Sequence, residues 1–76
     1  MPTGNNMRVE RVTRFWSIRT VASSIGVHPN TLARWERGEA EPSANGLLKL
    51  AHLYGVTPDY LMGYAADKHS TAMVPA

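Results

Sequence analysis

The sequence predicts an all-α domain of five helices that contains a helix-turn-helix. Residues typical of helix starts and ends recur along the chain, and no stretch alternates apolar and polar residues as a strand does. The strongest signal is the stretch VASSIGVHPNTLARWERG at 21–38. Within it, Ala22 lets two helices approach closely, Gly26 ends the first of them, and Leu32 returns the second to the core. Further apolar residues extend this seam at helical spacing, namely Val21, Ile25 and Trp35.

Capping residues bound the helices of the N-terminal half. A first helix is expected over about 6–15, with Asn5 or Asn6 as its cap. Its apolar stripe would consist of Met7, Val12 and Phe15 or Trp16. Ser17 caps a second helix at 18–25. His28 and Pro29 open a third helix, because proline suits the first helical position, and Gly38 ends it.

Two further helices are expected in the C-terminal half. Ser43 caps a fourth helix over about 44–54, and Gly55 stops it. Its expected core residues are Leu47, Leu48, Leu50, Ala51 and Leu53. Thr57 caps a short fifth helix in which Pro58 takes the first position, and the residues expected to pack back on the core are Tyr60 and Leu61. The folded domain is therefore expected at 6–63, after a flexible start at 1–5 and before a flexible tail at 64–76.

Composition limits the class of protein. The 76 residues suffice for one small core, and no apolar run approaches the roughly 20 residues of a membrane helix. The N-terminal MPTGNN lacks the regions of a signal peptide, which fits a cytoplasmic protein. There is no cysteine, and three scattered histidines do not form a metal site: His28, His52 and His69. No nucleophile, base and acid stand together, so we expect neither an enzyme nor a cofactor or small-molecule substrate.

The basic residues are concentrated in the first quarter of the chain, although the net charge is only +2. Four arginines stand there against a single acid, Glu10; they are Arg8, Arg11, Arg14 and Arg19. A local excess of this kind suits contact with phosphates. A solubilising helix surface explains the same excess equally well.

The expected third helix has an apolar side and a polar side. Leu32 and Trp35 lie on the first. The residues of the second lie within about 60° of one another on a helical wheel: Asn30, Ala33, Arg34 and Arg37. An amide pairs with adenine, a guanidinium with guanine, and a methyl group packs on the thymine methyl. Two arginines and an asparagine most often form a solvated face, but the preceding turn aims this side outward and favours DNA contact.

Three stretches of the chain resemble the Cro and phage-repressor helix-turn-helix proteins, also called the XRE family. They are VASSIG at 21–26, NTLARWERG at 30–38 and PSANGLLKLAHLYGVTPDYLMG at 42–63. The resemblance implies a five-helix lambda-repressor-like DNA-binding domain, with its third helix in the major groove. It further implies sequence-specific binding to double-stranded DNA and regulation of transcription, as a repressor, by a homodimer on an inverted-repeat operator.

The resemblance also implies roles for single residues. The positions that face bases in the family correspond to Pro29, Asn30, Ala33 and Arg34. Phosphate contacts are expected from helix N-termini and from basic or hydroxyl groups beside them. The candidates are Arg11, Ser17, Ile18, Arg19, Ser23 and Arg37. Arg11 and Glu36 match a family pair that ties the first helix to the end of the third and would orient the recognition helix.

The first helix departs from the family pattern near its end. Phe15 and Trp16 replace the usual glycine and leucine, and Glu10 stands where an apolar residue is common. If the helix is shifted as a result, Arg8 or Arg14 takes the place of Arg11 in the pair. These alternatives stay open on the sequence alone.

Two further departures concern the grip on phosphates. Ile18 stands where the family often has a glutamine, so its backbone donor remains and the side-chain donor is lost. The loop after the third helix carries Glu39 and Glu41, where basic residues would favour phosphates. These acids must point away from DNA or weaken its binding.

A protein-interaction module of the same fold is the alternative function. Such a module would be an antitoxin that masks a toxin or a bridging factor that binds the transcription machinery. A tail that orders on a partner would favour it. For the homodimer, the expected surface is the fifth helix and its neighbours, with three exposed candidates: Tyr60, Met62 and Tyr64.

Overall fold

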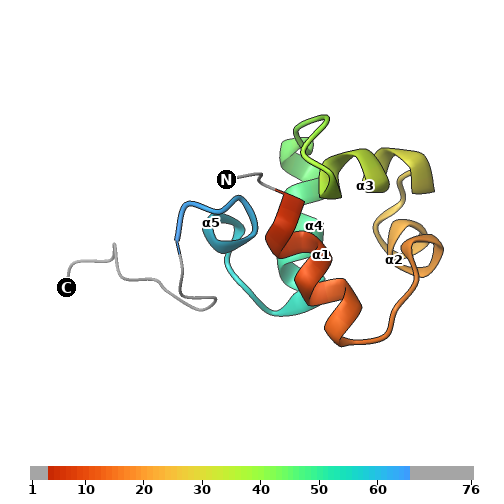
Figure 1. The fold of residues 1–76 in the computed structure, drawn as a ribbon, viewed down its shortest axis with the longest axis horizontal. Coiled ribbons are helices and arrows are strands. Elements are labelled where there is room, and N and C mark those ends of the chain that lie inside the picture. The colour runs from red at the N-terminus through yellow and green to blue at the C-terminus, as the bar shows by residue number, and fades with distance from the viewer. Residues whose placement is uncertain (1–3, 66–76) are drawn as a thin grey trace.

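The computed structural model describes residues 4–65, which form five α-helices and, within that range, no strand. The helices are α1 (Gly4–Thr13), α2 (Ile18–Ile25), α3 (Pro29–Glu36), α4 (Ala44–Tyr54) and α5 (Pro58–Leu61). α1 and α4 lie at the centre, with α2 and α3 on one side and α5 on the other (Figure 1). The predicted all-α, five-helix fold is confirmed. Of the tail expected at 64–76, residues 66–76, with His69, lie outside the described residues.

Capping residues begin and end the helices largely as the sequence predicts. Ser17, Ser43 and Thr57 each accept a hydrogen bond from the backbone N–H three residues further on. Gly26 and Gly55 close α2 and α4 with φ values of +75° and +69°, a left-handed conformation that glycine adopts without steric cost. The predicted bounds of α2 and α4 are confirmed. The last helical residue of α3 is Glu36, two residues before Gly38.

The start of α1 differs from the prediction. The helix begins at Gly4, so Asn5 and Asn6 lie inside it and neither caps it. The Asn6 side-chain amide instead donates a hydrogen bond to the backbone carbonyl of Tyr60, with 2.6 Å between the two atoms. This bond joins the first turn of α1 to α5, which explains why an asparagine with no capping role is held inside a helix.

The end of α1 also comes early, at Thr13. Phe15 follows with a φ of +59°, the left-handed value that glycine usually supplies at this place. The backbone N–H of Trp16 closes the turn on the carbonyl of Arg11 at 3.2 Å. Because of this turn, the Phe15 side chain is 94% exposed, and its expected place in the core is wrong. Trp16, the other candidate, packs against the core instead.

Two more apolar residues expected in the core lie at the surface, Val12 and Leu48. On α4 the inward stripe has a helical spacing of three and four residues: Leu47, Leu50, Ala51 and Tyr54. Leu48 lies about 100° away from that stripe. On α1 the inward stripe that begins at Met7 continues through Glu10, so Val12 falls outside it.

Buried apolar side chains from all five helices form one core. Its members are Met7, Val21, Ala22, Ile25, Leu32, Trp35, Leu50, Ala51, Tyr54, Tyr60 and Leu61. The predicted seam between the second and third helices is confirmed, because Ala22 and Leu32 have no exposed surface. This seam fixes α3 against α2 and thereby decides which side of α3 faces outward.

A buried carboxylate, Glu10 of α1, stands where the proteins that the sequence resembles commonly have an apolar residue. Glu10 accepts a hydrogen bond from the hydroxyl of Tyr60 at 2.8 Å and from Nη1 of Arg14 at 2.7 Å. Arg14 also donates to the backbone carbonyl of Tyr54 at 2.9 Å, at the end of α4. Burial and the bond to Glu10 raise the pKa of Tyr60 to about 12. Tyr60 therefore belongs to the core, and its expected place on an exposed dimer surface is wrong.

Gly46 leaves room on α4 for the Trp35 ring of α3. A Cβ atom at this position would lie 2.5 Å from Cη2 and 2.9 Å from Cζ3 of the Trp35 ring. We expect Gly46→Ala to lower the free energy of unfolding by up to about 2 kcal/mol, since overpacking costs about 1–3 kcal/mol and the gain in helix propensity is ~1 kcal/mol. Urea denaturation measures the change. Asn45→Ala, at an exposed neighbour, is the control, and equal stabilities of the two variants would contradict this packing.

Candidate nucleic-acid interface

α3 presents one buried and one outward side. Its buried residues are Leu32, Trp35 and Glu36. The residues expected to face bases are exposed or half-buried, and their spacing places them together on the outward side: Pro29, Asn30, Ala33 and Arg34. The polar side expected from the sequence is thus present as a continuous surface, one amide and one guanidinium being a helical turn apart.

The first turn of α3 is held by a histidine cap. Nδ1 of His28 accepts a hydrogen bond from the backbone N–H of Asn30 at 3.0 Å. In a neutral imidazole the other nitrogen, Nε2, then carries the proton. Pro29 follows at the first helical position, where a missing N–H has no cost. The cap therefore fixes the backbone of Asn30 and leaves its side-chain amide at the surface.

The start of α2 combines a hydroxyl cap with unused helix donors. Oγ of Ser17 accepts a hydrogen bond from the backbone N–H of Thr20 at 3.0 Å. The first N–H groups of a helix have no partner inside it, and the helix dipole makes this end attractive to anions. Ile18 is half-buried here, while Arg19 and Ser23 are exposed on α2, four residues apart.

A bidentate ion pair joins α1 to the end of α3. Nε of Arg11 lies 2.8 Å from Oε2 of Glu36, and Nη2 lies 2.9 Å from Oε1. The remaining nitrogen of Arg11 donates to the carbonyl of Trp16 at 3.0 Å. The hydrogen bond with Glu36 raises the pKa of Arg11 above its ordinary value. Arg14, one of the alternatives for this position, lies in the turn directly after α1 and pairs with Glu10 of that helix.

A hollow of about 350 Å³ lies where α1, α2 and α3 meet. Its lining brings together residues that are distant in the sequence: Arg8, Arg11, Ile18, Ala33, Glu36 and Arg37. Arg8 and Arg37 thus line the same hollow as Ile18, the first residue of α2, where the helix dipole is positive. Arg19 and Ser23 do not line this hollow.

Arg8 is the one residue of this hollow to which the sequence assigned no separate role. It was expected only as part of the basic first quarter or as a substitute for Arg11. The signal that identifies it is its spacing, since residues three apart on a helix share a face and Arg8 precedes Arg11 by three. Arg8 is exposed and is a candidate for phosphate contact together with Arg37.

The two acids after α3 differ in their surroundings. Glu39 forms an exposed ion pair with Arg37, in which Nε of Arg37 lies 2.8 Å from Oε2 of Glu39. Glu41 is exposed two residues later. Glu39 therefore lies beside Arg37, one of the residues expected to contact a phosphate.

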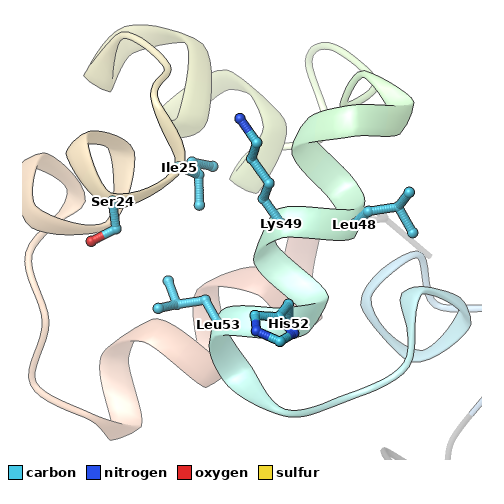
Figure 2. A pocket seen from close by; sticks show the side chains of 6 residues that line it. All are labelled: Ser24, Ile25, Leu48, Lys49, His52 and Leu53. Carbon is cyan, nitrogen blue, oxygen red and sulfur yellow. The ribbon is translucent and has the colours of Figure 1, made fainter.

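A second hollow lies between α2 and α4. Figure 2 shows Ile25 and Leu53 pointing into the space between the two helices, whereas Leu48 points away from it. The other lining residues are Ser24, Lys49 and His52. Across residues 4–65, no group of three or more His, Cys, Asp or Glu residues is placed to hold a metal ion. In the same part of the chain, no helix is both long and apolar enough to cross a bilayer.

Comparison with known proteins places this geometry in a family. A helix-turn-helix family model matches residues 10–61, which include the α2–α3 pair and the Arg11–Glu36 contact. The chain belongs to the Cro-type (XRE) helix-turn-helix family. Relatives in this family include the transcriptional regulator ImmR of Bacillus subtilis, 32% identical over 63 residues, and the regulator AnsR of the same organism, 32% identical over 69 residues.

The matches cover most of this chain but only part of each relative. The alignments cover 83% and 84% of this chain but only 50% of ImmR and 60% of AnsR. The chain therefore spans about half the length of these helix-turn-helix regulators, and it corresponds to one part of them.

Solved structures of the P22 c2 repressor share the five-helix fold. The crystal structure of that repressor with a synthetic operator has a TM-score of 0.79 and 28% identity, covering 86% of this chain and 98% of the repressor chain. The solution structure of its DNA-binding domain has a TM-score of 0.72 and 30% identity, covering 80% of both chains. The chain described here thus has the same fold as the P22 c2 repressor, which was crystallised in complex with a synthetic operator.

Proposed function

We propose that this chain binds double-stranded DNA sequence-specifically and represses transcription. The observation that carries the proposal is the outward side of α3, which exposes Asn30 and Arg34 and whose Ala33 lines the basic hollow at the N-terminus of α2. In this arrangement α3 lies in the major groove and α2 crosses the DNA backbone. The similarity to an operator-bound repressor supports the same orientation.

Base recognition is assigned to four residues of α3. The side-chain amide of Asn30 pairs with an adenine edge, and the guanidinium of Arg34 pairs with a guanine edge. Pro29 and Ala33 supply apolar contacts for thymine methyl groups. Each good bidentate contact contributes about 1–3 kcal/mol of discrimination against the wrong base.

Phosphate contacts are assigned to the residues around that reading side. Ser17 and the backbone N–H of Ile18 offer donors at the N-terminus of α2. The side chains assigned to the adjacent phosphates are Arg8, Arg19, Ser23 and Arg37. The pair of Arg11 with Glu36 orients α3 relative to α1, and Arg11 adds positive charge to the same hollow.

We further propose a homodimer that acts on an inverted repeat. One reading helix covers few base pairs, so two copies related by a two-fold axis supply the needed selectivity, with half-sites about 34 Å apart. Exposed Tyr64 and half-buried Met62, at the end of α5, are the candidates for the contact between copies. A DNA-binding regulator of this kind would act in the cytoplasm, where its operator is accessible.

A salt titration and a site selection together test this function. The chain should bind a random-sequence duplex weakly, and the logarithm of the binding constant should fall linearly with the logarithm of salt concentration. Selection from a random DNA pool should yield a two-fold symmetric motif. Binding to no duplex at any salt concentration would contradict the proposal and would favour a protein-interaction module instead.

Arg8→Ala is expected to weaken binding to the selected operator and to random duplex by similar factors, because a phosphate contact carries no base information. The salt dependence should become shallower by about 0.9 in log–log slope, the value for one phosphate. Lys49→Ala is a matched control that removes an exposed cation from the hollow between α2 and α4. If both variants change the slope equally, Arg8 has no specific phosphate contact.

A further inference from the structure

The ion pair between Arg37 and Glu39 lies at the end of the proposed recognition helix. Nε of Arg37 is 2.8 Å from Oε2 of Glu39, and Nη2 of Arg37 is 3.1 Å from Oε1. Both side chains are more than half exposed. The contact uses two parallel N–H donors of the guanidinium, which is also how a guanidinium binds a phosphate.

The backbone places Glu39 at this position. Gly38 has a φ of +75°, so the chain reverses directly after α3. The N–H of Glu39 donates to the carbonyl of Arg34 at 2.9 Å, and the N–H of Gly38 donates to the carbonyl of Trp35 at 3.1 Å. This helix-ending turn anchors the backbone of Glu39 beside the last turn of α3. The carboxylate is therefore held next to Arg37 by the fold, in addition to its own attraction.

The Glu39 carboxylate interacts with two exposed guanidiniums at the end of α3, those of Arg37 and Arg34. The hydrogen bond from Arg37 holds the pKa of Glu39 below its ordinary value, and the positive charge of Arg34 lowers the pKa further. Arg34, Arg37 and Glu39 together thus carry a single net positive charge. A phosphate approaching Arg37 meets a group that already occupies the same donors.

We propose that Glu39 is a built-in competitor of DNA phosphate for Arg37 and that it restrains binding to duplex of any sequence. This inference rests on the proposed function and adds to it a residue that sets the affinity of the site. Free Arg37 would contribute a phosphate contact. Paired Arg37 contributes it only when Glu39 is displaced or shares the guanidinium, so the contact is weakened for operator and random DNA alike.

Glu39→Gln tests the proposal, with Glu41→Gln as the matched control. Both substitutions remove one exposed negative charge from the same loop, but only the first removes the pair with Arg37. At low salt we expect Glu39→Gln to bind a random-sequence duplex and the selected operator about twofold to fivefold more tightly, the range for an exposed ion pair. Its log–log salt slope should be steeper by about 0.9, and that of Glu41→Gln should be unchanged.

An Arg37→Ala background shows whether Glu39 acts through Arg37. In that background Glu39→Gln should give no more gain than Glu41→Gln does. Weaker binding of Glu39→Gln in the otherwise unchanged chain would overturn the proposal, since Glu39 would then position Arg37 for DNA. Equal effects of the two glutamine variants would also overturn it and leave the proposed function standing. A chain that binds no duplex at all would remove both.

Discussion

An Arg11→Met variant is expected to lose about 3 kcal/mol of its free energy of unfolding. Glu36 is buried, and Arg11 satisfies both of its carboxylate oxygens. Removing one partner of a buried pair leaves an uncompensated charge, which costs about 3–5 kcal/mol; the lower figure applies because Arg11 keeps some solvent contact. Chemical denaturation followed by circular dichroism measures the loss.

Two further variants separate this effect from others. Arg19→Met removes an exposed arginine from α2 and should change stability by less than about 0.5 kcal/mol. A double variant, Arg11→Met with Glu36→Met, removes both charges and should recover most of the loss, since apolar replacements of a buried pair are often neutral. A double variant as unstable as the single one would show that the loss comes from another contact of Arg11, such as its bond to the Trp16 carbonyl.

The second large effect is expected on base recognition. Arg34→Ala and Asn30→Ala should each lose preference at one position of the operator, worth about 1–3 kcal/mol of discrimination, because each removes one bidentate contact with a base edge. Both side chains are exposed, so the melting temperature should stay close to that of the unchanged chain. Sequencing of sites selected from a random pool measures the preference directly.

The outcome that contradicts this assignment is equally specific. Selected motifs identical to that of the unchanged chain would show that Arg34 and Asn30 do not contact bases. A uniform loss of affinity at all sequences would instead assign them to phosphates, and it would be accompanied by a shallower salt dependence.

Local signals in the sequence were sufficient for most of the fold. Ser17, Ser43 and Thr57 sit where a hydroxyl satisfies a helix N-terminus, and Gly26 and Gly55 sit where the chain turns left-handed. Both effects act over three or four residues, so they can be read without knowing the partners of any other residue. The same holds for the alternation of buried and exposed residues along α3, which follows from helical periodicity alone.

The errors concern residues whose surroundings are set by distant parts of the chain. Glu10, noted only as a departure from the family pattern, shares the inward face of α1 with Met7, and its burial is stabilised by a hydrogen bond from Tyr60, fifty residues later. No periodicity rule places an acid in a core. Phe15 was one of two alternatives, with Trp16, for the apolar stripe of the first helix, but the turn after α1 gives it a left-handed backbone and an outward side chain.

The candidate site likewise contains residues that a local pattern brings together and residues that depend on distant parts of the chain. The residues expected to face bases lie on one helix, so the helical wheel was enough to bring them together. The basic hollow joins three helices, and the place of Arg8 in it depends on how α1 crosses the start of α2 and the end of α3. The Glu39 pair depends on the reversal at Gly38. The arrangement of the three helices around the hollow is not encoded in a local pattern, whereas the Glu39 pair joins two residues that are only two apart in the sequence.

The two sides of α3 make the domain suitable for redesign. Leu32, Trp35 and Glu36 hold the helix in place, while exposed Asn30 and Arg34 contribute little to the core. Substituting the exposed pair by residues other than glycine and proline should change stability by no more than about 0.5 kcal/mol per position. A library randomised there would consist mostly of folded proteins, and natural variation could reach new operator sequences by single steps without passing through an unfolded intermediate.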